Sequence, residues 1–331
     1  MVYLDSAATT KQKFFAKDFI DETTFLNSNA GYAYKTRHIL AQQREIIKEC
    51  LGLKGGGVIF TRCATESAEL FGKLWSTGII CSVKEHDSVY RLQRPHSDNR
   101  VWVQQTVNPL TGEIFNMPVD EPPFAMDMTA GIGKVKTPIH NGCQALWFSG
   151  HKFHAPHVGV LWLCDELMKK RATKDEKNQF DVLHGTVDCA SICALAAALQ
   201  SCSDGKLIVQ KQEKWFLLVE YLMRKLLDNE IAYKFVGNNE INRTLAINAI
   251  LLRGINADSL QQFLASKDIY IGVGGSACAT EHDFRVLKMG YRLSQDEAEQ
   301  VVRISYDEDT THKDIEQFVD GVIEFKKRFL E

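Results

Sequence analysis

The chain has 331 residues, 45% of them hydrophobic, with a formal net charge of −3 at pH 7. This length allows one large domain, or a large and a small one, and the mild charge argues against nucleic acid or an anionic membrane as a bulk partner. No apolar run approaches the roughly 18–20 residues of a membrane span and no secretory signal is visible, so we expect a cytoplasmic protein without direct membrane binding.

Helical and strand patterns alternate over the first two hundred residues. A helical apolar period extends from 39 to 51 and ends at Gly52, and a second helix begins at Thr65. Short apolar runs predict buried strands at 58–61, 78–83, 100–104, 124–127 and 145–148. This alternation predicts an α/β fold with a mostly parallel sheet flanked by helices, and such sheets bind ligands at the carboxyl ends of their strands.

The pattern changes from about residue 188. Helices are predicted at 188–200, 213–227 and 257–265, strands at 244–252 and 268–273, and a closing helix whose start Thr311 and Asp314 can cap. We therefore predict a large domain over 1–204 and a smaller α+β domain over 205–331. The first ten or so residues are expected to pack near the smaller domain.

Lys152 lies in a short polar turn between two apolar, strand-like runs. A lysine in such a turn can lose solvation and act as a nucleophilic amine, as a Schiff-base lysine for pyridoxal phosphate must. The alternative is a surface lysine in a loop.

Residues that can hold a phosphate occur at two turns. Ala64 and Thr65 stand at a predicted helix start, where free backbone N–H groups and the helix dipole attract anions. Ser149 and His151, just before Lys152, can add further contacts.

Two other polar residues follow predicted strands. Asp127 can keep a pyridine nitrogen protonated, or it can cap a helix. His86 can stack on a cofactor ring and move protons, although a surface histidine is the commoner case. A metal on His151, His154 and His157 is disfavoured, because Pro156 interrupts the series and no carboxylates are nearby in sequence.

The nine cysteines are odd in number and irregularly spaced, which disfavours a disulfide framework and fits a reducing cytoplasm. Cys189 and Cys193 lie one helical turn apart and are expected to be buried side chains rather than metal ligands. Cys278 lies in a small-residue loop after a strand, where a thiol is accessible as a nucleophile.

Arg303, inside an apolar run, needs an anionic partner, either a substrate carboxylate or an internal acid.

These residues together resemble the cysteine desulfurases of the class V aminotransferase family, which have the fold-type I architecture of pyridoxal-phosphate enzymes. The resemblance covers nearly the whole chain, in the correct order. Its motifs are Tyr3–Thr10, Ala64–Glu66, His86, Asn108, Asp127, Ser149–Lys152, Gly185–Thr186, Gly275–Cys278 and Arg303.

The resemblance implies a pyridoxal 5'-phosphate cofactor bound covalently to Lys152. The cofactor contacts it implies are Ala64, Thr65, His86, Asn108, Asp127, Ser149, His151, Lys152 and Thr186. Among these, Thr186 reaches the phosphate of a neighbouring subunit in a homodimer. The substrate L-cysteine lies near Asn108, with its carboxylate on Arg303. The catalytic residues implied are Lys152, His86 and Cys278, and Cys278 takes the sulfur.

Three features depart from the family. Ala130 stands where the family usually has a glutamine that contacts the cofactor's ring oxygen. The chain is unusually short, because segments after His86 and between Asn108 and Asp127 are trimmed. The segment that follows Cys278 is also brief, which limits how far this thiol can carry sulfur.

The sequence therefore predicts a cysteine desulfurase that converts L-cysteine to L-alanine through a persulfide on Cys278. The sulfur acceptor is expected to be a protein: an iron–sulfur scaffold, a tRNA-thiolation enzyme or a component of a nucleic-acid modification system. Two alternatives are a selenocysteine lyase or other class V lyase or transaminase, and a degenerate family member that serves as a scaffold.

Overall fold

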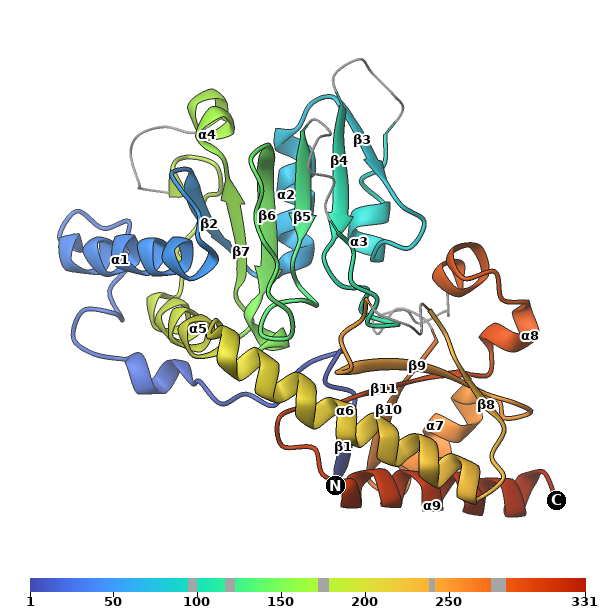
Figure 1. Cartoon of the computed structure of the whole chain (residues 1–331). Helices are drawn as coiled ribbons and strands as arrows, with labels where there is room; N and C mark the ends of the chain where they lie inside the picture. Colours follow the sequence, from blue (N-terminus) through green and yellow to red (C-terminus); the bar gives the residue numbers. More distant parts are fainter. Residues whose placement is uncertain (95–99, 117–122, 172–178, 238–241, 275–283) are drawn as a thin grey trace.

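A computed structural model describes residues 1–94, 100–116, 123–171, 179–237, 242–274 and 284–331 (Figure 1). The strands are β1 (Val2–Leu4), β2 (Gly57–Thr61), β3 (Gly78–Cys81), β4 (Arg100–Gln105), β5 (Phe124–Asp127), β6 (Cys143–Ser149), β7 (Gly159–Leu163), β8 (Tyr233–Phe235), β9 (Ile247–Leu252), β10 (Ile269–Val273) and β11 (Val301–Ser305). The α-helices are α1 (Tyr34–Leu51), α2 (Ala64–Leu74), α3 (Asp87–Tyr90), α4 (Asp165–Arg171), α5 (Cys189–Cys202), α6 (Gly205–Asp228), α7 (Ala257–Ala265), α8 (Gln295–Ala298) and α9 (His312–Phe329). Short 3-10 helices occupy Ala16–Phe19 and Gly150–Lys152, and a π-helical turn occupies Val286–Gly290.

The first sheet has six strands in the order β2-β7-β6-β5-β4-β3. Strands β3, β4, β5 and β6 are parallel, and only β7 runs against its neighbours β2 and β6. Strands β2, β5 and β7 are buried along their whole length, as expected for a sheet covered on both faces. The predicted mostly parallel α/β sheet is confirmed.

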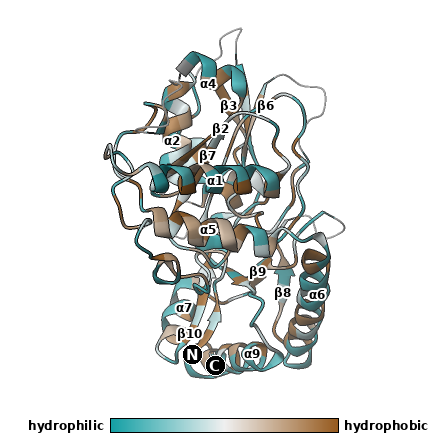
Figure 2. Ribbon diagram, turned by 90° about the vertical axis from the view of Figure 1, so that its left-hand side faces the viewer, coloured by the Kyte–Doolittle hydropathy of each residue, from teal (hydrophilic) through white to brown (hydrophobic). Residues whose placement is uncertain are grey.

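Helices cover both faces of this sheet. Helix α2 packs on one face through Ala68 and Phe71, with Trp147 of β6 beneath it. Helices α1 and α5 pack together on the other face, where Figure 2 shows them side by side. Since α2 follows β2 directly, its N-terminus lies at the edge of the sheet where the parallel strands end.

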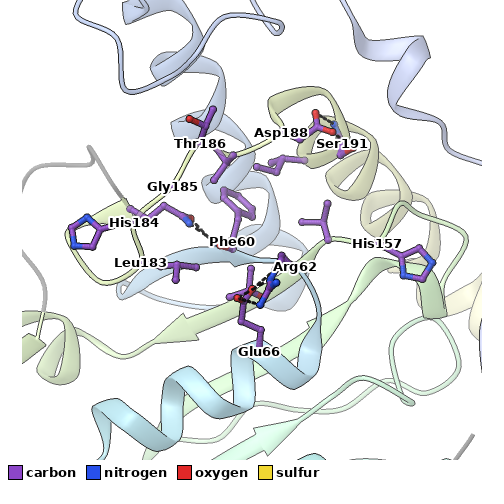
Figure 3. A pocket seen from close by; sticks show the side chains of 15 residues that line it. Phe60, Arg62, Glu66, His157, Leu183, His184, Gly185, Thr186, Asp188 and Ser191 are labelled. Atoms are coloured by element: carbon purple, nitrogen blue, oxygen red, sulfur yellow. Dashed lines mark hydrogen bonds and ion pairs between the residues drawn. The ribbon is translucent and has the colours of Figure 1, made fainter. Parts of the chain in front are cut away.

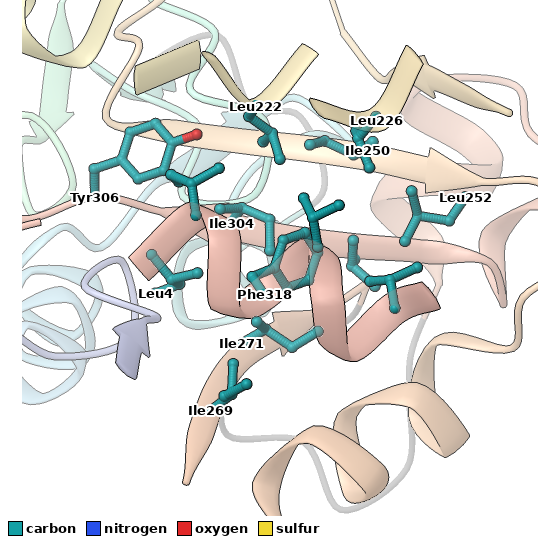
Figure 4. Packing of buried hydrophobic residues seen from close by; sticks show 14 of the residues in the cluster. Leu4, Leu222, Leu226, Ile250, Leu252, Ile269, Ile271, Ile304, Tyr306 and Phe318 are labelled. Carbon is teal, nitrogen blue, oxygen red and sulfur yellow. The ribbon is translucent and has the colours of Figure 1, made fainter. Parts of the chain in front are cut away.

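The second sheet has five strands in the order β1-β10-β11-β9-β8. Its apolar core lies between the strands and helices α6, α7 and α9, and Figure 4 shows Phe318 of α9 among Ile304, Ile271 and Leu222. The N-terminal strand β1 belongs to this sheet, because it pairs in parallel with β10. The N-terminal segment therefore runs from the second sheet towards the first.

Helices α5 and α6 connect the regions of the two sheets. Helix α5 is buried over nearly its whole length, including Cys189 and Cys193, as the sequence predicted. Among the described residues, no single helix is long and apolar enough to cross a membrane; α5 and α6 pass that test only as a pair bent by 73°.

Local signals located most element ends correctly. Gly52 ends α1 in the left-handed conformation, and Thr311 and Asp314 form a capping box at the start of α9. Helix α6 begins at Gly205 rather than at 213, because the Asp204 side chain accepts a hydrogen bond from the backbone N–H of Lys206. The polar run 210–214 interrupts the apolar period within α6, so the period alone misses this start.

Candidate active site

A cavity of about 110 Å³ lies where strands β4 and β5 end and helix α2 begins. The residues predicted from the sequence that line it are Ala64, Thr65, His86, Asp127, His151 and Lys152. They come from four separate segments, so the fold brings together residues that the sequence could only order along the chain.

The start of α2 forms one wall of the cavity. Its N-cap residue, Cys63, has extended backbone and makes no side-chain capping hydrogen bond. The first helical residues Ala64 and Thr65 line the cavity, and first-turn N–H groups have no carbonyl partner within their own helix. The dipole of this 11-residue helix also favours an anion at this end. This wall fits a phosphate group.

Lys152 is half-buried at the end of the short 3-10 helix that follows β6. Its Nζ donates hydrogen bonds to the carbonyl oxygens of Ala7 and Ala8, each at 2.7 Å. The N-terminal segment thereby holds the amine at the cavity, which Ala8 also lines.

Asp127 and His86 form another part of the wall. Asp127 is 6% exposed, and its Oδ1 accepts a hydrogen bond from the backbone N–H of Thr129 at 2.9 Å. The described residues between β5 and β6 contain no helix, so this hydrogen bond caps a turn rather than the helix considered from the sequence, and the carboxylate also lines the cavity. The backbone N–H of Ser88 donates to Nδ1 of His86 at 3.2 Å, which leaves Nε2 to carry the proton of the neutral ring. Burial lowers the pKa of His86, against the opposing effect of Asp127.

His151 also lines the cavity, and its ring stacks on His157 with 4.5 Å between ring centroids. Burial, then the neighbouring charge of Lys152, lowers the pKa of His151 to about 3. The ring is therefore neutral at pH 7 and can donate a hydrogen bond without bringing a second cation to the cavity.

Arg303 is 3% exposed and pairs with Asp5, with Nη2 of the arginine 2.7 Å from Oδ1 of the aspartate. Its Nη1 donates to the carbonyl oxygen of Pro109 at 3.1 Å, and Pro109 lines the cavity. Of the two partners considered from the sequence, the internal acid is the one present in the structure.

Asn108 and Ser149 do not line this cavity. The Asn108 side chain donates to the carbonyl of Lys84 and accepts from the backbone N–H groups of Leu110 and Thr111, so it stabilises its own turn. The Ser149 hydroxyl is fully buried and donates to the carbonyl of Val158 at 3.4 Å. The sequence motifs predicted that these two residues lie close to the site, but they could not predict which way the two side chains point.

Thr186 lies apart from the small cavity, in a larger pocket of about 510 Å³ (Figure 3). The exposed threonine shares that pocket with His157 and with the ion pair between Arg62 and Glu66, whose closest atoms are 2.9 Å apart. Both Arg62 and His157 are next to residues that line the small cavity. Arg62 precedes Cys63 in the sequence, and the ring of His157 stacks on that of His151.

Sequence reasoning assigned no role to Gln105, which lines the cavity and is 2% exposed. Gln105 is in register with Asp127 on the adjacent parallel strand. Its backbone N–H donates to Glu85 at 2.8 Å, and burial, together with the charge of Asp127, raises the pKa of Glu85 well above its usual range. A polar residue at the end of a predicted strand was the available signal.

Ala130 also lines the cavity, at the position where the family usually has glutamine.

The structure corrects one premise about metals. His154 was taken to lack carboxylate neighbours, but its Nε2 lies 3.1 Å from both Asp307 Oδ1 and Glu308 Oε1. Those residues follow β11, far away in sequence. Lys211 lies 3.1 Å from the same Glu308 oxygen, so the group forms an ion-pair network. Cys278 lies outside the described residues.

The six-stranded, helix-covered sheet with a cavity at its strand ends, followed by a smaller second sheet, is the arrangement expected for the fold-type I architecture. Two solved structures share this architecture. One is a NifS-like protein with a TM-score of 0.80 and 19% identity, and the match covers 98% of this chain and 99% of that one. The other is the NifS-like protein from Rickettsia africae ESF-5, with a TM-score of 0.83 and 20% identity, and the match covers 99% of both chains. The predicted fold-type I architecture is confirmed.

The family model for Aminotransferase class-V matches residues 123–318, more than half of the chain, so the chain belongs to the class V aminotransferase family. Over nearly its full length the chain is also similar to two other protein sequences. It is 23% identical to the putative cysteine desulfurase NifS of Bacillus subtilis (strain 168), covering 96% of this chain and 93% of that protein. It is 23% identical to a NifS/IcsS protein homolog of Lactobacillus delbrueckii subsp. bulgaricus, covering 99% and 98%.

Proposed function

We propose that the protein is a pyridoxal-phosphate-dependent cysteine desulfurase, which converts L-cysteine to L-alanine and transfers the sulfur to Cys278. One observation carries the proposal: Lys152, Asp127, His86 and the start of α2 line a single cavity. An amine, a carboxylate, a neutral imidazole and an anion-binding helix end are the groups that pyridoxal phosphate requires. The names of the similar proteins support the choice of reaction.

Each group has a separate task. The backbone N–H groups of Ala64 and Thr65 would hold the phosphate, with His151 as a neutral donor. Lys152 would attach the cofactor, and Asp127 would keep its pyridine nitrogen protonated. When bound, the cofactor supplies an electron sink that stabilises negative charge at the substrate α-carbon.

Proton movement falls to Lys152 and His86. Two carbonyl oxygens hold the amine of Lys152 at the cavity, and the neutral ring of His86 can accept a proton. We place the substrate carboxylate at Arg303. Because Arg303 already pairs with Asp5, the substrate carboxylate must either displace the Asp5 carboxylate or bind the guanidinium together with it.

Sulfur transfer is assigned to Cys278 from its sequence context. Its thiolate attacks the substrate sulfur, a bond forms between the two sulfur atoms, and the substrate carbon–sulfur bond breaks. The electron pair of the broken bond stays with the carbon fragment, which is protonated to alanine. The persulfide sulfur then passes to an acceptor, for which an iron–sulfur scaffold or a thiolation enzyme is proposed.

Absorption spectroscopy combined with persulfide mapping by mass spectrometry tests this function. With pyridoxal phosphate and cysteine added, we expect a visible cofactor band, alanine release and an extra sulfur on Cys278. A Lys152→Ala variant should lose the band. A Cys278→Ser variant should keep the band and release no alanine; normal turnover by that variant would rule out the mechanism.

The same assay separates the alternatives. Faster alanine release from selenocysteine than from cysteine, without need of Cys278, indicates a selenocysteine lyase. A protein that shows no cofactor band even with excess pyridoxal phosphate is a scaffold. The proposed homodimer, in which Thr186 serves the neighbouring subunit's phosphate, predicts that Thr186→Ala weakens cofactor binding although Thr186 does not line the small cavity.

The domain boundary also remains a proposal. We place it between residues 204 and 205, where α5 ends and Asp204 caps α6. Residues 1–10 would then belong to the smaller domain by their strand pairing.

A further inference from the structure

The turn that carries His86 is held by a cation from a distant part of the chain. Arg285 precedes the π-helical turn Val286–Gly290. Its Nη2 donates to the carbonyl of Glu85 at 2.9 Å and to Oδ1 of Asp87 at 2.7 Å, and its Nη1 donates to the carbonyl of Val83.

These three acceptors lie on both sides of His86 in sequence. A planar guanidinium can bind several oxygens at once in fixed directions, which an ammonium cannot. The Arg285 side chain is 8% exposed, and its guanidinium carbon lies 3.9 Å from the centre of the Tyr90 ring on α3. Stacking on this ring fixes the plane of the guanidinium group.

We propose that Arg285 is a positioning residue for His86, which fixes the turn Val83–Asp87 and offsets the charge of Asp87 next to the imidazole. The inference deepens the proposed function, since it takes His86 to face the cofactor and substrate. It assigns a task to a residue that does not line the cavity.

The charges around His86 show why the offset matters. Asp127 of β5 and Asp87 of α3 favour the protonated ring, whereas Lys152, after β6, and Arg285 disfavour it. Glu85, the preceding residue, is buried and its pKa is raised well above the usual range, so it adds little negative charge. With Arg285 in place, burial keeps the pKa of His86 low and the ring is available as a base.

Histidine NMR on the cofactor-loaded protein, without cysteine, tests the inference. The rings are labelled with ¹³C, and the His86 signal is identified by its loss in His86→Gln. We expect Arg285→Gln to raise the pKa of His86 by about one unit, because Asp87 then lacks its counterion. Asp87→Asn should lower it, and the double variant should lie between the two.

Lys288→Gln is the matched control. Lys288 lies on the same π-helical turn, and its side chain donates to Gln295 at 2.9 Å; we expect the His86 titration of this variant to match the unmodified protein. Should Arg285→Gln fail to fold, the double variant is compared with Asp87→Asn: with Asp87 already neutral, the loss of Arg285 should still raise the pKa of His86.

A merely structural clamp would lower thermal stability in Arg285→Gln and leave the His86 titration of that variant in place. That result would overturn the inference. Because no cysteine is present, the outcome is independent of turnover: shifted titrations without alanine release would contradict only the proposed function, and unshifted titrations with normal alanine release would contradict only the role of Arg285.

Discussion

Two cations at the candidate site are held by one short N-terminal segment. Ala7 and Ala8 offer their carbonyl oxygens to Lys152, and Asp5 offers its carboxylate to Arg303. A buried guanidinium without an anion is costly, so Asp5 stabilises Arg303. It also competes with any substrate carboxylate for the same cation.

Replacing Asp5 with Asn separates these two effects. Asp5→Asn should lower the KM for cysteine several-fold, because the competing carboxylate is gone, and should also lower the melting temperature, because Arg303 loses its counterion. Steady-state alanine release and thermal unfolding measure the two quantities. A lower melting temperature with an unchanged KM would mean that Arg303 serves only the internal salt bridge.

At the scale of elements, the position of the N-terminus of α2, which is proposed to bind the phosphate, depends on how β7 packs beside it. Gly159 begins β7 and faces the backbone at Cys63, the N-cap of α2. A Cβ at Gly159 would lie 2.5 Å from the Cys63 carbonyl carbon and 2.2 Å from Thr61 Oγ1. Backbone at that distance must move, and the start of α2 moves with it.

Gly159→Ala should therefore weaken cofactor binding by roughly tenfold, about 1.4 kcal/mol. Titration of the apo-protein with pyridoxal phosphate, followed by absorption, measures the affinity. Gly205→Ala is the control, since a Cβ at Gly205 meets nothing within 4 Å. Equal affinities in the two variants would show that α2 tolerates the displacement.

At the scale of the whole molecule, an ion-pair network connects the two sheet regions next to the site. His154, two residues after Lys152, bonds Asp307 and Glu308 beyond β11. Its Nδ1 also lies 2.8 Å from the carbonyl of Lys11 in the N-terminal segment. Despite burial, these acids raise the pKa of His154 to about 9.

This shift predicts a stability that depends on pH. The pKa is higher in the folded state than the 6.5 or so of an unfolded histidine, so the stabilisation is complete below about pH 6.5 and is lost as the pH rises through about 9. His154→Gln should reduce the free energy of unfolding by about 2 kcal/mol at pH 6.5 and by much less at pH 9.5.

Urea unfolding of both proteins at the two pH values measures the difference, with the exposed His38→Gln as control. A deficit of the same size at pH 6.5 and pH 9.5 would mean that His154 stabilises the protein by packing rather than by charge.

Much of the fold and part of the site followed from the sequence. Strand and helix periods depend on which face of each element is buried, so they predicted the parallel strands β3–β6 and placed the start of α2 at Thr65, one residue after its observed start at Ala64. Asp127 and Lys152 were recognisable because a polar residue that ends an apolar run lies at the edge of a sheet.

Only the tertiary structure decided which residues meet. The pairing of β1 with β10, the contact of Arg303 with Asp5, and the clamp from Arg285 to the His86 turn join segments roughly two hundred or more residues apart. Local periodicity carries no information about such partners, because they depend on how whole elements pack. The sequence by itself determined the elements and the chemical groups available to the site, and packing determined where each group points.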